Sequence, residues 1–376
     1  MKKSITFVTQ ADLLGKKNSL TKIAKTIINA LNPDQIICRD LPYKKPKKYS
    51  EIIPGGGAFF KILTGLNTLL GINDSQIHLT TRLLSFFLSR KKIKTDLLFL
   101  HYSAFKEVIE KNRDKTIVGF ATSVNSKRIL EILRQEYGRF GLDYPVRYYY
   151  YFQESLLQCD YIFAWSEFAR KELVSEGFPN ERIFVIGNAV DTERFVPKPS
   201  KKTKKFTALC VADFDLNKGV QYLIEVWKEL ALEDAELVLI GHKTRAVRKI
   251  IRDAKCSTIL SISHCNPIPH YQKSTVFVLP SLAEGAARVI YEAMSCELPI
   301  IATENAGGPV ANEKSGFVGP IQDKVFLKKS ILEYYQNRKL VYNHGHQARK
   351  KVLEYDFSKF EARLRRGLAE ILYNEK

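Results

Sequence analysis

Short apolar runs rich in β-branched and aromatic residues alternate with amphipathic stretches along most of this chain, and this alternation limits the possible folds more than any other feature. In the first half an amphipathic stretch at 20–31 accompanies apolar runs at 5–9, 35–38, 96–100, 116–120 and 161–165. The pattern stops over 196–205 and resumes at 206–212, 221–230, 236–240, 276–280, 288–296 and 299–302. Such alternation is typical of βαβ units, in which a helix connects neighbouring parallel strands. We therefore predict an α/β fold with two doubly wound, Rossmann-like domains joined near residue 200.

The two predicted domains indicate where function should lie. With 376 residues, 45% of them apolar, the chain is long enough for two domains with separate cores. Two such domains would face each other across a central cleft, and open parallel sheets bind ligands in the loops at the carboxyl ends of their strands. We expect the functional residues in those loops.

The formal net charge of +19 is concentrated in clusters at 44–48, 90–94 and 201–205. Such clusters favour an anionic partner, and nucleic acid, an anionic membrane surface and a phosphorylated substrate all fit the charge. The third cluster lies beside two prolines, so we interpret it as a solvated interdomain linker. No recognised nucleic-acid-binding motif accompanies the charge, which disfavours nucleic acid as the partner. The apolar stretch at 58–66 favours instead a peripheral contact with an anionic membrane.

The cysteines and the apolar runs bear on the compartment. Six cysteines are scattered without a C-x-x-C pair or a zinc-type histidine spacing, so we predict reduced thiols. The first apolar segment ends within a few residues at Thr9 and Gln10, which is too short for a signal peptide. No apolar run reaches the roughly 18–20 residues of a membrane-spanning helix. We therefore expect a cytoplasmic protein, in solution or on the inner face of the membrane.

The most informative segment runs from 276 to 308 and places two carboxylates around a loop-to-helix junction. A strand at 276–280 leads to Glu284, and Glu292 falls about two turns further on along the predicted helix. The free N–H groups at such a helix start, together with small residues at 285–287, suit a pyrophosphate, and the later carboxylate suits ribose hydroxyls. Glu284 lies nearer the reacting end and suits sugar hydroxyls. Taken alone, two glutamates at this spacing are more often surface charge, so the pattern needs its context.

That context is a resemblance to the family-4 retaining glycosyltransferases of the GT-B fold. The two glutamates and the paired Gly307 and Gly308 resemble the donor site of that family. Four further segments resemble other motifs of the family in the same order, and they lie at 164–170, 185–195, 217–223 and 237–241. The likeness covers roughly residues 160–355, whereas the first half matches only in general layout. The resemblance implies an acceptor-binding domain at 1–199, a nucleotide-sugar-binding domain at 200–355, and a closing helix at 356–376 that packs back on the first domain.

The resemblance also implies roles for individual residues. Glu284 would contact hydroxyls of the donor sugar, Glu292 the ribose and Lys218 the pyrophosphate. The backbone would bind phosphate oxygens at five consecutive residues, which are Gly285, Ala286, Ala287, Arg288 and Val289. A nucleotide leaving group develops negative charge, which a fixed cation and aligned N–H donors stabilise. No Asp-x-Asp motif offers itself as a divalent-metal site for a nucleotide sugar. We therefore predict that the enzyme needs neither a metal nor a permanently bound cofactor.

Two positions in the second half depart from the family pattern. Asp213 stands where the family usually has a phosphate-binding arginine, five residues before Lys218. Arg288 stands where an aliphatic residue is common, and it is a candidate to compensate by reaching the phosphates.

The first half departs from the pattern as well. Ala121 follows the strand after which many relatives carry a histidine, and His101 is the nearest substitute, which makes it a candidate catalytic residue. Gly15 is the glycine that remains ahead of the helix at 20–31, and we predict that it contacts a phosphate of the donor or the acceptor.

Together these features predict transfer of a sugar from a UDP- or GDP-sugar to a glycan, lipid-linked or small-molecule acceptor in cell-surface polysaccharide or glycolipid synthesis. Retention with the leaving phosphate as the base fits the missing histidine better than a double displacement, which needs a carboxylate nucleophile. Two alternatives remain. Asp213 and Ala121 leave open a non-catalytic relative with the same fold, and the charge leaves open a basic nucleic-acid-binding protein.

Overall fold

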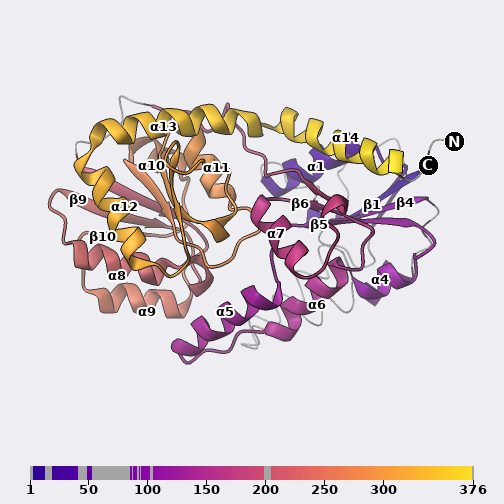
Figure 1. Cartoon of the computed structure of the whole chain (residues 1–376), viewed down its shortest axis with the longest axis horizontal. Coiled ribbons are helices and arrows are strands. Elements are labelled where there is room, and N and C mark those ends of the chain that lie inside the picture. Colours follow the sequence, from indigo (N-terminus) through magenta and orange to yellow (C-terminus); the bar gives the residue numbers. More distant parts are fainter. Residues whose placement is uncertain are drawn as a thin grey trace.

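The computed structural model of the chain describes residues 3–12, 19–40, 49–52, 85, 86, 88–90, 93, 95–101, 105–198 and 205–374. Within these residues the chain forms two parallel sheets with helices packed around them (Figure 1). The predicted α/β fold with two Rossmann-like domains is confirmed.

The first sheet has seven strands in the order β3-β2-β1-β4-β5-β6-β7. The strands are β1 (Ile5–Asp12), β2 (Gln35–Asp40), β3 (Tyr49–Ile52), β4 (Leu97–His101), β5 (Thr116–Ala121), β6 (Tyr161–Ala164) and β7 (Ile183–Val185). The helices of this half are α1 (Ser19–Leu31), α4 (Lys106–Glu110), α5 (Lys127–Arg139), α6 (Val146–Leu156) and α7 (Glu167–Ser175), followed by the 3-10 turn η1 (Asn180–Arg182). Every residue of β4 and β6 is buried, as expected for parallel strands that are covered on both faces.

The second sheet has six strands in the order β10-β9-β8-β11-β12-β13. The strands are β8 (Phe206–Val211), β9 (Ala235–Ile240), β10 (Ile259–Ile262), β11 (Val276–Leu279), β12 (Ile300–Thr303) and β13 (Gly316–Gly319). The helices are α8 (Val220–Leu230), α9 (Arg245–Ala254), α10 (Ile268–Lys273), α11 (Arg288–Ser295), α12 (Lys324–Gln336) and α13 (Arg338–Val352). Two 3-10 turns, η3 (Leu216–Lys218) and η4 (Glu304–Ala306), follow β8 and β12.

The strand order of the second sheet determines where a ligand should bind. Counted along the sequence from β8, the order is that of a dinucleotide-binding fold, and it reverses between β8 and β11, which pair directly. In such sheets ligands bind outside the carboxyl ends of the strands at the reversal. The loops after β8 and β11 carry Lys218 and Glu284, so the fold places both residues at the expected crevice.

The last helix connects the two halves of the molecule. After α13 and the short turn η5 (Leu353–Tyr355), α14 (Phe357–Asn374) contacts α1 of the first half, and α13 and α14 follow one edge of the molecule (Figure 1). At the turn, Val190 N–H donates to the carbonyl of Tyr355 over 3.0 Å. The domain limits at 199 and 355 remain predictions.

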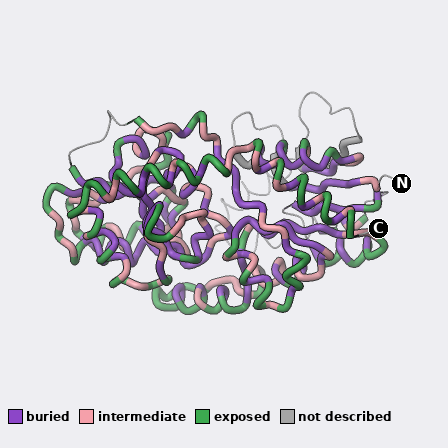
Figure 2. The backbone as a smooth tube through the Cα atoms, turned by 45° about the horizontal axis from the view of Figure 1, so that its top comes forward, coloured by how far each residue is buried: buried purple, intermediate pink, exposed green. Residues whose placement is uncertain are grey.

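Burial follows the layered architecture. Buried backbone segments lie inside both halves, whereas exposed residues follow the outer helices (Figure 2). Across the parts of the chain that are described, we find no helix with the length and hydropathy needed to span a bilayer.

Candidate active site

Lys218 and Glu284 meet where the loops after β8 and β11 converge. Lys218 ends η3, and its Nζ forms an ion pair with Oε1 of Glu284. Both side chains are 18% exposed, so the pair is largely but not fully shielded from solvent. Ser281 Oγ donates a further hydrogen bond to the same carboxylate over 3.4 Å. The structure thus brings together two side chains that the sequence analysis predicted to contact the donor.

Gly219 allows the turn with Lys218 to lie against β11. Its φ is +64°, and a Cβ atom at this position would lie 1.9 Å from the carbonyl oxygen of Pro280. Leu282 N–H donates to the carbonyl of Asn217 over 2.8 Å, which also joins the two loops. Only glycine tolerates both the left-handed backbone and the close approach. The turn is therefore fixed relative to the strand end that leads to Glu284.

Glu292 lies on α11 and is mostly enclosed. Because α11 begins at Arg288, Glu292 is about one turn inside the helix, not two as predicted, and 284–287 form a loop. Its side chain is 13% exposed, Tyr271 Oη donates to Oε2 over 3.1 Å, and Arg288 Nε lies 3.7 Å from Oε1. Burial raises the pKa of Glu292, while the charge of Arg288 and the Tyr271 hydrogen bond oppose that rise. A mostly buried carboxylate with a raised pKa, one turn into the helix after Glu284, is a candidate functional group.

The start of α11 offers fewer free amides than the sequence suggested. Ala287 N–H donates to the carbonyl of Ala306 over 2.9 Å, so the expectation that Ala287 binds phosphate through its amide is wrong for this structure. The amides of Gly285, Ala286, Arg288 and Val289 have no acceptor among the residues that the structure describes. These four amides remain candidate donors to an anion. Arg288 and Val289 begin the helix, whose first N–H groups lack partners within it, and Gly285 and Ala286 precede it in the loop.

The loop before α11 is held from the first half of the molecule. Ser166 Oγ donates to the carbonyl of Gly285, and Asn188 Nδ2 donates to the carbonyl of Ala286 over 3.2 Å. A Cβ atom on Gly285 would lie 2.1 Å from the carbonyl oxygen of Thr122, in the loop after β5. Residues from both sheets therefore build the surroundings of this loop.

His101 is not placed for catalysis. It is 0% exposed, and its ring stacks between Phe7 and Trp165, with ring centres 5.9 and 6.3 Å away. Its Nδ1 shares a hydrogen bond of 2.9 Å with Oγ1 of Thr9. Burial lowers the pKa of His101 to about 3, so the ring is neutral at physiological pH. The expected catalytic role of His101 is wrong for this structure, in which the histidine is a core residue.

Some predicted features lie outside the described residues. Gly15, the apolar stretch at 58–66 and the basic cluster at 44–48 are among them, as are most residues of the other two basic clusters.

Asp213 and Asp215 form an Asp-x-Asp sequence in the loop after β8. Asp213 is exposed, whereas the Asp215 carboxylate accepts the N–H of Leu216 over 2.8 Å and caps η3. Across the described ranges no group of three or more histidine, cysteine, aspartate and glutamate side chains is arranged to hold a metal ion.

Tyr271 is a partner of Glu292 in the candidate site that the sequence did not indicate. It is fully buried on α10 and reaches Glu292 across 21 positions of sequence. A single buried tyrosine in a short helix has no spacing pattern that points to a distant carboxylate, so no signal in the sequence marked it.

The fold and this site define a class. Two doubly wound domains, with a lysine–carboxylate pair and a buried carboxylate at the strand reversal of the second, are the architecture of GT-B proteins.

Comparisons with known proteins identify the family within this class. Residues 83–194 match the family described as Glycosyltransferase Family 4, and residues 191–351 match Glycosyl transferases group 1. The two matches overlap at 191–194 and together cover residues 83–351, which is well over half of the chain, so the chain belongs to the glycosyltransferases that these two family models describe.

One curated relative is similar in sequence, and two solved structures are similar in fold. The capsular polysaccharide biosynthesis glycosyltransferase CapM of Staphylococcus aureus is 25% identical over 57% of this chain and 61% of its own length. Sucrose-phosphate synthase from Thermosynechococcus elongatus superposes with a TM-score of 0.72 at 14% identity over all of both chains. The Anabaena protein HepE, solved with UDP-glucose, superposes with a TM-score of 0.64 at 15% identity over 98% of this chain and 100% of its own. At these identities the two structures show a shared fold.

The match to curated relatives is partial in length. It covers 41%, 50%, 47% and 61% of four curated relatives, so the chain spans about half of their length.

Proposed function

We propose that this chain is a glycosyltransferase that uses a nucleotide diphosphate sugar, either a UDP- or a GDP-sugar, and a glycan, lipid-linked or small-molecule acceptor. The observation that carries the proposal is the ion pair of Lys218 and Glu284 at the strand reversal of the second sheet, with the mostly buried Glu292 on the helix that follows. The family supports the activity, and the UDP-glucose in HepE supports the donor class. The name of CapM supports a role in cell-surface polysaccharide synthesis.

Lys218 is the residue that we assign to the diphosphate. Its ammonium already faces the carboxylate of Glu284, and a diphosphate brings more negative charge to the same place. When Lys218 turns to the diphosphate, Glu284 becomes free to accept hydrogen bonds from the hydroxyls of the sugar. The ion pair therefore holds the Lys218 ammonium and the Glu284 carboxylate beside each other before the donor binds.

Glu292 is the residue that we assign to the ribose. Tyr271 holds Oε2, which leaves Oε1 to accept ribose hydroxyls. Arg288 lies one turn earlier beside Oε1 and can move to the phosphates when a donor binds. This assignment requires the carboxylate of Glu292 to be ionised, because an ionised carboxylate accepts hydrogen bonds from hydroxyl groups at both oxygens.

The assignment is tested by calorimetry with UDP, GDP and their sugars. Glu292→Gln should weaken nucleotide binding about tenfold or more, because a hydrogen bond to a charged group contributes about 1.5–3 kcal/mol. Glu297→Gln is the matched control, since Glu297 lies just beyond α11 and pairs with His346. Unchanged affinity in Glu292→Gln would refute the ribose assignment. Donor binding without transfer to any acceptor would identify a non-catalytic relative.

We further propose that transfer retains the anomeric configuration, with the leaving phosphate accepting the acceptor's proton. The burial of His101 supports this route, because that imidazole is not offered to a substrate as a base. NMR of the product gives the configuration, and inversion would exclude the route.

We also propose that Lys218 and the free amides before and within the start of α11 neutralise the diphosphate without a divalent metal. Full activity in excess chelator is the expected result, and its loss would contradict this proposal.

Peripheral contact with an anionic membrane on its cytoplasmic face is a further part of the proposal. It is supported by the sequence alone, through the basic clusters and the apolar stretch at 58–66. Flotation with liposomes should show binding that requires acidic lipid, and equal recovery with neutral liposomes would end the idea.

A further inference from the structure

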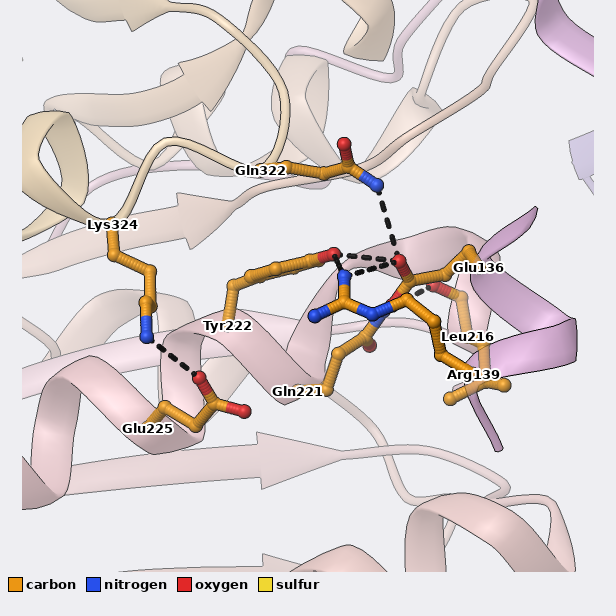
Figure 3. Close-up of polar contacts among 8 residues, drawn as sticks. All are labelled: Glu136, Arg139, Leu216, Gln221, Tyr222, Glu225, Gln322 and Lys324. Atoms are coloured by element: carbon orange, nitrogen blue, oxygen red, sulfur yellow. Dashed lines mark hydrogen bonds and ion pairs between the residues drawn. The ribbon is translucent and has the colours of Figure 1, made fainter. Parts of the chain in front are cut away.

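A buried carboxylate of the first half, on α5, contacts the first residues of α8 in the second half and so joins the two halves of the molecule. Glu136 lies near the end of α5 and is 1% exposed. Its carboxylate accepts hydrogen bonds from Tyr222 Oη over 2.6 Å, Gln221 Nε2 over 2.8 Å and Gln322 Nε2 over 3.1 Å (Figure 3). It also pairs with Arg139 of its own helix over 3.2 Å. Three of its four partners thus belong to the other domain.

The origin of the donors decides what this cluster can do. A buried carboxylate is costly unless hydrogen bonds replace its water, and among the described residues the cation that pairs with Glu136 is Arg139, whose side chain is 63% exposed. The full set of donors reaches Glu136 only in the arrangement of domains that the structure shows. Buried polar clusters of this kind add little net stability, and their best supported role is to select one arrangement among several.

The cluster is connected to the candidate donor site through Gln221. The amide nitrogen of Gln221 donates to Glu136 and also, over 3.0 Å, to the carbonyl of Leu216, which begins η3. Lys218 ends the same three-residue turn. The helix with Glu136 contacts η3 as well. One side-chain amide therefore links the interdomain carboxylate to the turn that carries Lys218.

We propose that Glu136 is a positioning residue for donor binding. Through Gln221 it fixes the turn that carries Lys218, and it does so only when the two domains have the arrangement seen in the structure. The role of Lys218 in this proposal rests on the proposed function, whereas the contact between the domains is independent of it. Donor affinity should then depend on a residue that belongs to the acceptor-side domain and does not touch the donor.

Glu136→Gln tests the proposal because it keeps the shape of the side chain while it replaces one acceptor oxygen by a donor. If the competent arrangement falls to about a tenth of the population, KM for the donor rises about tenfold while kcat changes little, since saturating donor restores the arrangement. Small-angle X-ray scattering without ligand should show a larger radius of gyration. Glu131→Gln is the matched control, because Glu131 lies on the same helix and pairs there with exposed Arg134.

Gln322→Ala provides the second variant, in case Glu136→Gln folds poorly. It removes one partner from the other domain and should shift KM in the same direction by a smaller factor. A folded Glu136→Gln protein with wild-type donor KM would overturn the proposal, whether or not its scattering changes. If the wild type binds no nucleotide, the proposed function fails, and the scattering of Glu136→Gln still reports on the domain contact. An unchanged radius of gyration would then overturn this inference too.

Discussion

Replacement of Tyr271 by phenylalanine tests how the buried carboxylate of Glu292 is stabilised. The phenol ring is fully buried on α10, and its hydroxyl donates to Oε2 of Glu292 over 3.1 Å. Tyr271→Phe removes this donor and keeps the ring in place. The glutamate then retains Arg288, whose Nε is 3.7 Å from the other carboxylate oxygen and too distant for a good hydrogen bond.

The size of the effect follows from the charge of the acceptor. Loss of a hydrogen bond to a charged group costs about 1.5–3 kcal/mol, against about 1 kcal/mol for a neutral pair. We expect a loss of about 2 kcal/mol in the free energy of unfolding at pH 8. For a domain of this size that loss lowers Tm by roughly 4–8 °C.

The pH dependence has a definite sign. Burial raises the pKa of Glu292, so the ionised form is disfavoured in the folded state and the protein loses stability as pH rises through that pKa. Tyr271 counters this loss by stabilising the ionised form, and its removal raises the pKa of Glu292 further. The cost of Tyr271→Phe is therefore full at high pH and falls toward that of a neutral hydrogen bond as the pH drops and the carboxyl group is protonated.

Tyr291→Phe is the matched control for this measurement. Tyr291 is also buried, and its hydroxyl accepts the N–H of Asn188 over 3.3 Å, without a carboxylate partner in that bond. Denaturant unfolding of both variants at pH 5 and pH 8 gives the comparison. An equal and pH-independent loss in the two variants would refute the reasoning, since it would show that the charge of Glu292 does not matter to Tyr271.

Two further predictions concern Gly285 and His101. Gly285→Ala would place a Cβ atom 2.1 Å from the carbonyl oxygen of Thr122, so we expect a loss of about 1–3 kcal/mol or an opening of the domains, seen by unfolding and by scattering. Gly138→Ala is its control, because a Cβ atom there meets nothing within 4 Å, and an unchanged Gly285→Ala protein would contradict the close contact. Burial lowers the pKa of His101 to about 3, so its NMR signal, identified by its loss in His101→Gln, should not titrate between pH 5 and pH 8. The unfolded chain binds that proton near its ordinary pKa, so His101 makes the fold less stable as pH falls below about 6.5, and a titration near that value would show that the ring is accessible.

The parts of the fold that sequence predicted are those with local, repeated signals. Buried parallel strands read as short apolar runs, and β11, α11 and β12 follow one another so closely that their order could be read directly. The same local signals placed Glu284 in the loop after β11. It did not show that 284–287 form a loop, because small residues such as Ala286 and Ala287 are compatible with both a loop and a helix start.

The parts that sequence could not predict depend on distant contacts. Tyr271 and Glu136 are single residues whose partners lie far away in sequence, and no periodicity connects them. His101 was misjudged for a related reason. Its position at a strand end suggested an open crevice, whereas Phe7 of the neighbouring strand β1 and Trp165, just after β6, enclose the ring.

The loop at 284–287, before α11, shows why donor binding depends on the arrangement of the domains as well as on the two glutamates of the motif. Ser166 and Asn188 hold the carbonyls of Gly285 and Ala286, so residues of the first domain bind one side of the loop. Glu136 reaches the Lys218 turn through Gln221 from the same domain. An isolated second domain would keep its sheet and both glutamates and would lose every one of these constraints. Donor affinity should therefore be a property of the two domains together, because each supplies contacts that orient the charged groups on the other.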